Sequence, residues 1–237
     1  MGSTQGLPIG KGLPDWTPRE LPSREPLVGR YCRLEALDPD LHAEALFTAN
    51  GLDEGGLNWT YLPYGPFPDL PAYRQWVVEV SKSDDPLFFA ILDLSGNQLG
   101  VASYLRMAPS NGSIEVGHIN YSPLLQRRRE ATEAMYLMMR RVFEELGYRR
   151  YEWKCDALHA NSLRAAERLG FVYEGTFRQA TIYKGRNRDT AWYSIIDSDW
   201  PRVGAELGSW LEPSNFDADG VQRSRLAVGR RTSDSTD

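Results

Sequence analysis

The stretch INYSPLLQRRREAT, residues 119–132, decides the fold of this 237-residue chain. Its first residues end an alternating, strand-like run, and its last residues open a helix whose apolar side chains recur at three- and four-residue steps. The first N–H groups of a helix have no partner within it, and the helix dipole adds partial positive charge there. This strand-to-helix junction therefore suits a phosphate group.

Three consecutive arginines lie in the junction, at Arg127, Arg128 and Arg129. Guanidinium groups bind phosphate oxygens through paired hydrogen bonds, so these side chains would add charge to a pyrophosphate site. Taken alone, the same pattern also describes the solvated face of a helix.

A second junction of the same kind favours the binding site. Residues 153–162 lead from a strand into a helix with a polar start, and that helix ends at Gly170. An ordinary capped helix, with Asn161 or Ser162 as its N-cap, also accounts for the polar start. Two such junctions on neighbouring strands indicate an open cleft where the strands splay apart.

Alternation, turn residues and helix caps predict the elements around these junctions. Helices are expected over 39–47 and 69–82, on either side of an aromatic, proline-rich loop over 58–68 that we call the aromatic loop. A further helix is expected after each junction. The strands are expected over 27–37, 87–93, 98–107, 113–121, 149–156, 171–183 and 188–197. This order predicts an α/β (α+β) domain with a mixed, mostly antiparallel central sheet of about seven strands and helices on both faces.

Composition sets the domain limits and excludes several classes of protein. Residues 1–26 read as an extended Gly/Pro-rich arm, 27–211 as the folded domain and 212–237 as a polar, disordered tail. The net charge of −5 argues against a nucleic-acid binder held by general electrostatics. No window reaches the roughly 18 to 20 apolar residues of a membrane span, and no secretory signal opens the chain, so we expect a cytoplasmic protein.

The cysteines and histidines do not suggest a metal. Cys32 and Cys155 lie in strand-like runs and read as buried thiols. No cysteine or histidine pair has the spacing of zinc ligands, so we expect no metal site.

Six short motifs follow one another between about residues 27 and 200. They are EVGH from Glu115, P-x-x-Q-R from Pro123, ATEA from Ala131, the helix from Ser162 to Gly170-Phe171, YEG from Tyr173 and IID from Ile195. In this order they resemble the GNAT acetyltransferases, particularly the ribosomal-protein N-terminal acetyltransferase branch (RimJ/RimL-like).

The resemblance implies a V-shaped cleft between two parallel strands that binds acetyl-CoA as the acyl donor. The pantetheine arm would pair with backbone groups of the first junction's strand, and the pyrophosphate would rest on the N–H groups of the turn. The cofactor-binding residues implied in this way are Ile119, Asn120, Tyr121, Gln126, Arg127, Arg128, Arg129, Glu130, Ala131, Thr132, His159, Asn161 and Ser162.

The chain departs from the family pattern at two positions. The acyl-CoA turn usually reads Gln/Arg-x-x-Gly-x-Gly/Ala, and Arg129 stands at its first glycine. Either the turn is less tight here, or ordinary right-handed geometry suffices. His159 stands where the family usually has asparagine, so that His159 replaces it or Asn161 does so from a shifted frame.

Direct acyl transfer needs a neutral amine, an oriented thioester and a proton for the leaving thiolate. Glu115 and Glu174 are our candidates for the general base, and Asp156 is a weaker third; each also reads as a surface or strand-pairing carboxylate. Ser162 is the candidate donor to the sulfur, and its alternative role is a helix cap. His118 reads as a side chain packed on the sheet.

The aromatic loop lies where the family roofs the acceptor site. Tyr61 and Tyr64 have hydroxyls that suit a substrate, whereas Trp59 equally fits a hydrophobic cluster that packs the loop. With Asp156, these are the expected substrate-binding residues. They favour a small-molecule or amino acid derivative as the amine acceptor.

Two other functions stay open. A protein N-terminal acetyltransferase requires an open groove for a peptide, and a non-catalytic acyl-CoA-binding regulatory domain requires no carboxylate. The long closing strands also leave a homodimer through sheet-edge pairing open.

Overall fold

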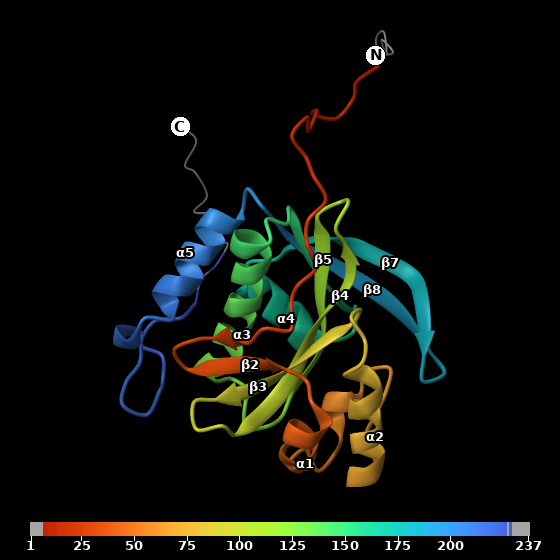
Figure 1. The fold of residues 1–237 in the computed structure, drawn as a ribbon, viewed down its shortest axis with the longest axis vertical. Helices are drawn as coiled ribbons and strands as arrows, with labels where there is room; N and C mark the ends of the chain where they lie inside the picture. The colour runs from red at the N-terminus through yellow and green to blue at the C-terminus, as the bar shows by residue number, and fades with distance from the viewer. Residues whose placement is uncertain (1–6, 227, 229–237) are drawn as a thin grey trace.

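The alternating apolar residues of this chain build one mixed sheet (Figure 1), and the computed structural model describes residues 7–226 and 228. The strands are β1 (Leu27–Val28), β2 (Cys32–Ala36), β3 (Leu87–Asp93), β4 (Gln98–Ala108), β5 (Ser113–Tyr121), β6 (Arg150–Asp156), β7 (Val172–Tyr183) and β8 (Arg186–Ile196). Their order is β1-β2-β3-β4-β5-β6-β8-β7. Within the described residues every neighbouring pair is antiparallel except β5 and β6, which are parallel.

Five α-helices accompany the sheet in the described part of the chain. They are α1 (Pro39–Asn50), α2 (Leu70–Val80), α3 (Arg129–Arg140), α4 (Ala160–Arg168) and α5 (Trp200–Trp210). Asp38 and Asp69 cap α1 and α2 as their sequence positions predict, each accepting hydrogen bonds from backbone N–H groups of the first turn. α3 continues into a π turn, Arg141–Glu145, before Gly147 ends it in the left-handed conformation.

The two faces of the sheet carry different helices because strand residues alternate between them. Phe88 and Ala90 of β3 pack with α1 and α2, and we call this side the α1 face. Phe89 and Ile91 pack with α3, α4 and α5 on the α3 face. In Figure 1, α3 and α5 lie together on one side, and α1 and α2 form a separate pair near β3.

The parallel strands β5 and β6 separate halfway along. They pair at four positions, the last being Val116 with Trp153. β5 then stays with β4 as far as Tyr121, while β6 stays with β8 to its end. A bulge in β5 marks the separation, where β5 has one residue more than β4 and His118 has a φ of 50°. Because a bulge bends and twists its strand, it turns β5 away from β6.

The fold class is as predicted, but the sheet has eight strands instead of seven. Residues 27–37 form a hairpin and not one strand, because the chain turns at Gly29. The buried carboxylate of Glu133 in α3 holds this turn: it accepts hydrogen bonds from the backbone N–H groups of Arg30 (2.7 Å), Tyr31 (2.6 Å) and Cys32 (2.8 Å). A Cβ at Gly29 would lie 2.5 Å from that carboxyl group, so only glycine fits.

The C-terminal part is more ordered than the sequence predicted. α5 was not expected, and its Val203 and Leu207 are fully buried against the α3 face. Residues 212–226, expected in a disordered tail, contain a 3-10 turn (Pro213–Asn215) and a buried Phe216 that bridges to Gln222. Residues 227 and 229–237, which complete the predicted tail, lie outside the described residues.

Residues 7–26 of the N-terminal arm have no regular helix or strand, and residues 1–6 lie outside the described chain. Side chains and backbone tie it to the domain: Trp16 Nε1 donates to the carbonyl of Ser110 (2.8 Å), and the carbonyl of Glu20 accepts from the hydroxyl of Tyr148 (3.0 Å).

We expect Glu133→Gln to destabilise the fold by about 3 kcal/mol, because the amide cannot accept all three charge-assisted bonds at the turn. Urea denaturation measures this difference. Glu145→Gln, which changes a half-exposed carboxylate of the same helix region, is the control and should change stability by less than about 0.5 kcal/mol. Equal effects of the two substitutions would contradict the role of Glu133.

Candidate functional site

The turn from β5 into α3 presents unused hydrogen-bond donors. Arg128 is the N-cap residue of α3, and no side chain caps the helix start. Arg127 has a φ of 62°, and the side chains of Arg127 and Arg128 are exposed and make no hydrogen bond or ion pair with residues 7–226 or 228. Gln126 closes the turn by donating from Nε2 to the carbonyl of Tyr121 (3.0 Å). An anion can therefore meet free N–H groups and two free guanidinium groups here.

Arg129, at the glycine position of the family turn, is helical, so right-handed geometry suffices there and the left-handed residue is Arg127. The Arg129 guanidinium carbon lies 4.1 Å from the ring centre of Tyr31 and 5.2 Å from that of Phe216. Its side chain therefore packs against the C-terminal segment and leaves only its backbone N–H at the helix start.

The next predicted residues, Glu130, Ala131 and Thr132, form the first turn of α3 with Arg129. Their backbone N–H groups lie at the helix start, where the first N–H groups have no acceptor within the helix and need one from outside it. The Thr132 hydroxyl is already engaged, since it accepts from Arg168 Nη1 (3.0 Å) at the end of α4.

The separated end of β5 carries an unusual buried amide. The side-chain oxygen and nitrogen of Asn120 are both buried without a hydrogen-bond partner, although only 2% of the residue is exposed. Ile119 is half-buried against the α3-face core, and the carbonyl of Tyr121 accepts from Asn58 Nδ2 (3.1 Å). Beyond the last paired position, the edges of β5 and β6 that face each other lack the ladder partner that a sheet supplies.

The start of α4 differs from the expected cap. His159, not Asn161 or Ser162, is the N-cap residue, and its ring stacks on Tyr61 with 4.2 Å between ring centres. Asn161 is exposed and accepts from Arg164 within the helix. Ser162 Oγ accepts from Trp153 Nε1 (2.9 Å), and the serine side chain is also a hydrogen-bonding neighbour of the Cys155 thiol.

Most aromatic side chains of the loop pack against one another and against the α1-face cluster. Trp59 is 5% exposed within the α1-face cluster, and Tyr64 is packed between Trp76 and His118. The hydroxyl of Tyr64 lies 3.1 Å from Nδ1 of His118. Tyr61 contacts the segment that precedes α4, where its hydroxyl donates to the carbonyl of Leu158 (3.3 Å).

Two of the predicted carboxylates are held by cations. Glu115 lies on the α1 face next to the last paired position of β5, and its oxygens are 2.7 Å from Arg106 Nη1 and 2.9 Å from Lys154 Nζ. Glu174 is bound by Arg150, and this hydrogen-bonded ion pair, with burial opposing it, lowers its pKa. Arg150 pairs with the first residue of β5, so Glu174 lies at the end where β5 and β6 are joined.

Asp156 is differently placed, because it ends β6 on the separated side. It is 5% exposed, and its two oxygens accept from the N–H of Leu158 (2.8 Å) and the hydroxyl of Tyr183 (2.9 Å). No cation forms an ion pair with Asp156 among residues 7–226 and 228.

Three further residues near the separated ends of β5 and β6 were not predicted as site residues: His118, Lys154 and Arg188. They come from β5, β6 and β8, and all lie on the α1 face. Strand side chains carry no motif of their own, so only the register of the sheet brings them together.

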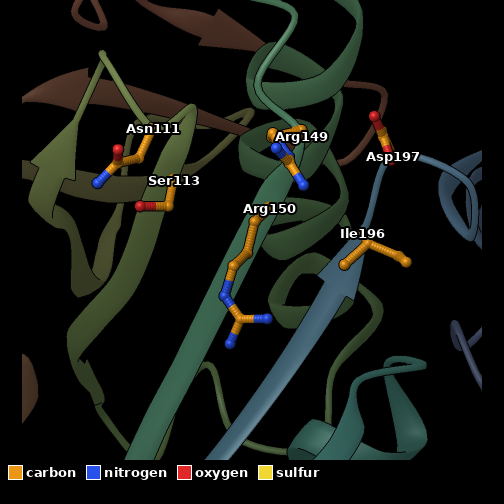
Figure 2. A pocket seen from close by; sticks show the side chains of 6 residues that line it. All are labelled: Asn111, Ser113, Arg149, Arg150, Ile196 and Asp197. Atoms are coloured by element: carbon orange, nitrogen blue, oxygen red, sulfur yellow. The ribbon is translucent and has the colours of Figure 1, made fainter. Parts of the chain in front are cut away.

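Two hollows elsewhere do not coincide with this place. One of about 300 Å³ lies at the opposite end of the sheet, where β5 and β6 begin (Figure 2), and Arg149, Arg150 and Ile196 are among its lining residues. Another of about 360 Å³ lies between α4 and the β7–β8 pair and is lined by Leu163, Tyr173 and other residues. Figure 2 shows Arg150 extending along the sheet between β5 and β8, and its guanidinium is committed to Glu152 and Glu174.

Within the described residues, no group of three or more Cys, His, Asp or Glu side chains is arranged to hold a metal ion. A search of the same residues finds no helix with the length and hydropathy needed to cross a bilayer.

His118 is uncharged at neutral pH. Burial, followed by the nearby charges of Arg106 and Arg188, lowers its pKa to about 4 from an ordinary value of 6.5. The unfolded chain therefore binds a proton between pH 6.5 and 4 that the folded chain does not, and stability falls as the pH is lowered through this window.

The wild-type protein loses stability between pH 7 and pH 5. We expect this loss to be about 2 kcal/mol smaller in His118→Gln, because the variant lacks the titrating ring. Urea denaturation at the two pH values measures it, and NMR titration of the histidine ring gives the pKa directly. A His118 that titrates near 6.5 would contradict this prediction.

Comparisons with known proteins identify the family. Residues 32–172 match the acetyltransferase (GNAT) domain. A GCN5-related N-acetyltransferase from Brucella melitensis has 46% identity and a TM-score of 0.88, covering 90% of this chain and 97% of that one. RimL, a ribosomal L7/L12 alpha-N-protein acetyltransferase, shares the fold with 21% identity and a TM-score of 0.61 over 80% of this chain and 98% of its own.

A curated relative, the SPbeta prophage-derived uncharacterized N-acetyltransferase YokL of Bacillus subtilis, is 27% identical over 116 residues, or 49% of this chain. The match spans 64% of the length of that relative. The family model and the fold agree with the motifs in the sequence: the chain belongs to the GNAT acetyltransferase family and is a GNAT-family N-acetyltransferase.

Proposed function

We propose that this protein transfers an acetyl group from acetyl-CoA directly to the primary amine of a small molecule. The observation that carries the proposal is the separation of β5 from β6 beside the uncapped start of α3. The backbone edges of the separated strands and the free donors of the turn are the two kinds of group that an amide-containing arm and a pyrophosphate require.

The residues present fit acetyl-CoA. The N–H groups of the first turn of α3, with the side chains of Arg127 and Arg128, would hold the pyrophosphate. The edge of β5 near Ile119 would pair with the pantetheine amides, and the unpartnered amide of Asn120 lies on the same strand end. Acetyl-CoA supplies a thioester whose carbonyl carbon the amine nitrogen attacks, with CoA leaving as the thiol.

The residues on the separated side would move the two protons. Asp156 is the best placed of the three predicted carboxylates to take the amine proton, directly or through water, because no cation holds its charge. Glu115 and Glu174 are neutralised by ion pairs, and Glu115 instead positions Lys154. Ser162, whose oxygen accepts from Trp153, would donate its hydroxyl hydrogen to the leaving thiolate in place of its contact with Cys155.

The closed aromatic loop supports a small acceptor over a peptide. Lys184 and Arg186, at the tip of the β7–β8 hairpin, donate to the carbonyls of Trp59 (2.7 Å) and Thr60 (2.6 Å). Tyr61 also contacts the segment that precedes α4, so the loop is attached to both sides of the place where the acceptor would lie. An open groove for a polypeptide would need these contacts to break.

We expect the double substitution Arg127→Gln/Arg128→Gln to weaken acetyl-CoA binding at least tenfold, because both free guanidinium groups are lost from the pyrophosphate site. Arg129→Gln keeps the backbone N–H and should change affinity less than about threefold while lowering Tm, since its cation–π contacts are lost. Calorimetric titration with acetyl-CoA and free CoA measures the affinities. Absence of acetyl-CoA binding by the wild-type protein would refute the proposal.

We expect Asp156→Asn to lower kcat for amine acetylation by about 100-fold or more without loss of acetyl-CoA affinity, since the proton acceptor is removed. Glu174→Gln is the matched control and should stay within about threefold of wild type. Thiol release reports the rate. Binding of acetyl-CoA without turnover of any amine would instead identify a regulatory acyl-CoA-binding domain.

A further inference from the structure

Arg188 stands on β8 just past the point where β6 ends. The last pair of these strands joins Asp156 to Thr190, two residues after Arg188. Strand alternation places Arg188, Thr190 and Trp192 on the α1 face, because Ala191 lies in the α3-face core. Arg188 therefore lies on the face of the sheet that carries the aromatic loop, away from the α3 start.

The guanidinium of Arg188 lacks a protein counter-charge. Its Nε donates to the hydroxyl of Thr190 (3.1 Å), and the two Nη groups donate to no acceptor within residues 7–226 and 228. Neither Nη atom of Arg188 is among the buried side-chain atoms that lack a hydrogen-bond partner. Both are therefore accessible to solvent, and a ligand can reach them.

Other cations on this side are already engaged. Arg106 and Lys154 pair with Glu115, and Lys184 and Arg186 donate to loop carbonyls. A half-buried arginine that keeps both Nη groups free and accessible at such a place is available to bind an external anion.

The position of Arg188 relative to Asp156 narrows the ligand. Two strand residues separate their register positions by about 7 Å. Tyr183 connects the two: its hydroxyl donates to Asp156 (2.9 Å), and its ring centre lies 6.0 Å from the guanidinium carbon of Arg188. One negative and one positive group, separated by a short span, complement a molecule with an amine and an anion close together.

We propose that the acceptor is an amino carboxylate, such as an amino acid, whose carboxylate binds Arg188 while its amine lies at Asp156. The inference rests on the proposed acetyl transfer and names the class of its acceptor. The fork of the guanidinium matches the two oxygens of a carboxylate, which makes Arg188 a specificity-determining residue. An acetyl donor leaves this arginine for the acceptor, whereas a succinyl donor would compete for it.

The electrostatics of neighbouring histidines agrees with this placement. Burial is the main reason that the pKa of His159 is lowered. The charge of Asp156 raises this pKa, and the charge of Arg188 lowers it. His118 on β5 is affected by Arg188 as well. The unpaired charge thus acts on residues of β5 and α4 that border the separated strands.

The test compares amines that differ in one group. Each protein amino acid is assayed by thiol release beside its amide, which stands for a peptide N-terminus, and its decarboxylated amine; phenylalanine, phenylalaninamide and phenethylamine form one such set. Wild type is compared with Arg188→Gln and Arg188→Lys, and Arg178→Gln on the exposed strand β7 is the control. Acetyl-CoA and succinyl-CoA serve as donors, and calorimetry checks acetyl-CoA binding for every variant.

We expect the wild-type protein to prefer at least one amino acid over its amide and its decarboxylated amine by tenfold or more in kcat/KM. Arg188→Gln should abolish this preference by raising KM for the amino acid with little change in kcat, and Arg188→Lys should restore part of it. Arg178→Gln should leave the preference unchanged. Acetyl-CoA affinity should be the same in all variants.

Three results would overturn the inference even when the wild-type protein binds acetyl-CoA. They are equal or better use of the amide and the decarboxylated amine, which lack a carboxylate, no acetylation of any carboxylate-bearing amine, and an Arg188→Gln variant that exchanges succinyl-CoA for acetyl-CoA instead of changing acceptors. Loss of acetyl-CoA binding in the wild-type protein would mean that the proposed function itself fails.

Discussion

The β-bulge at His118 is the constraint on which the arrangement of the site depends. Before it, β5 and β6 form an ordinary parallel pair; after it, β5 turns toward β4 and the strands no longer meet. The left-handed backbone conformation of His118 is unfavourable for any residue other than glycine. The surrounding packing must therefore hold His118 in this conformation. Its stacking on Tyr64 and contact with Phe88 supply that packing.

The start of α3 depends on contacts from both ends of the chain. Glu133 binds the β1–β2 turn, which brings Tyr31 to the side of α3. Tyr31 and Phe216 then enclose the side chain of Arg129. The glycine position of the acyl-CoA turn can thus hold arginine, because the long side chain has a place to pack away from the helix start.

Charge pairing divides the α1 face into two parts. At the joined end of the sheet, Arg150 pairs with Glu152 and Glu174, and Lys154 also pairs with Glu152. At the separated end, no residue in the described part of the chain forms an ion pair with Asp156 or Arg188, although only two strand positions separate these two residues. A fold that leaves opposite charges unpaired at such close range keeps both available to a ligand with both charges.

Motifs in the sequence determined the two strand-to-helix junctions, the family and most strand limits, because turn residues, caps and apolar periodicity are local properties. The same local patterns did not show the turn at Gly29, since a carboxylate from α3 forms it. They also gave no sign of α5 or the ordered segment after it. Their apolar residues are buried only against a sheet assembled from distant parts of the chain.

The candidate site divides in the same way. The sequence by itself indicated the residues of the proposed acyl-CoA turn, because a helix start and its arginines are contiguous. Only the tertiary structure separated Asp156 from Glu115 and Glu174, since whether a carboxylate is free depends on which cations the sheet register places beside it. The register alone also brought Arg188 within reach of Asp156, because residues 32 positions apart in the chain meet only when β6 pairs with β8.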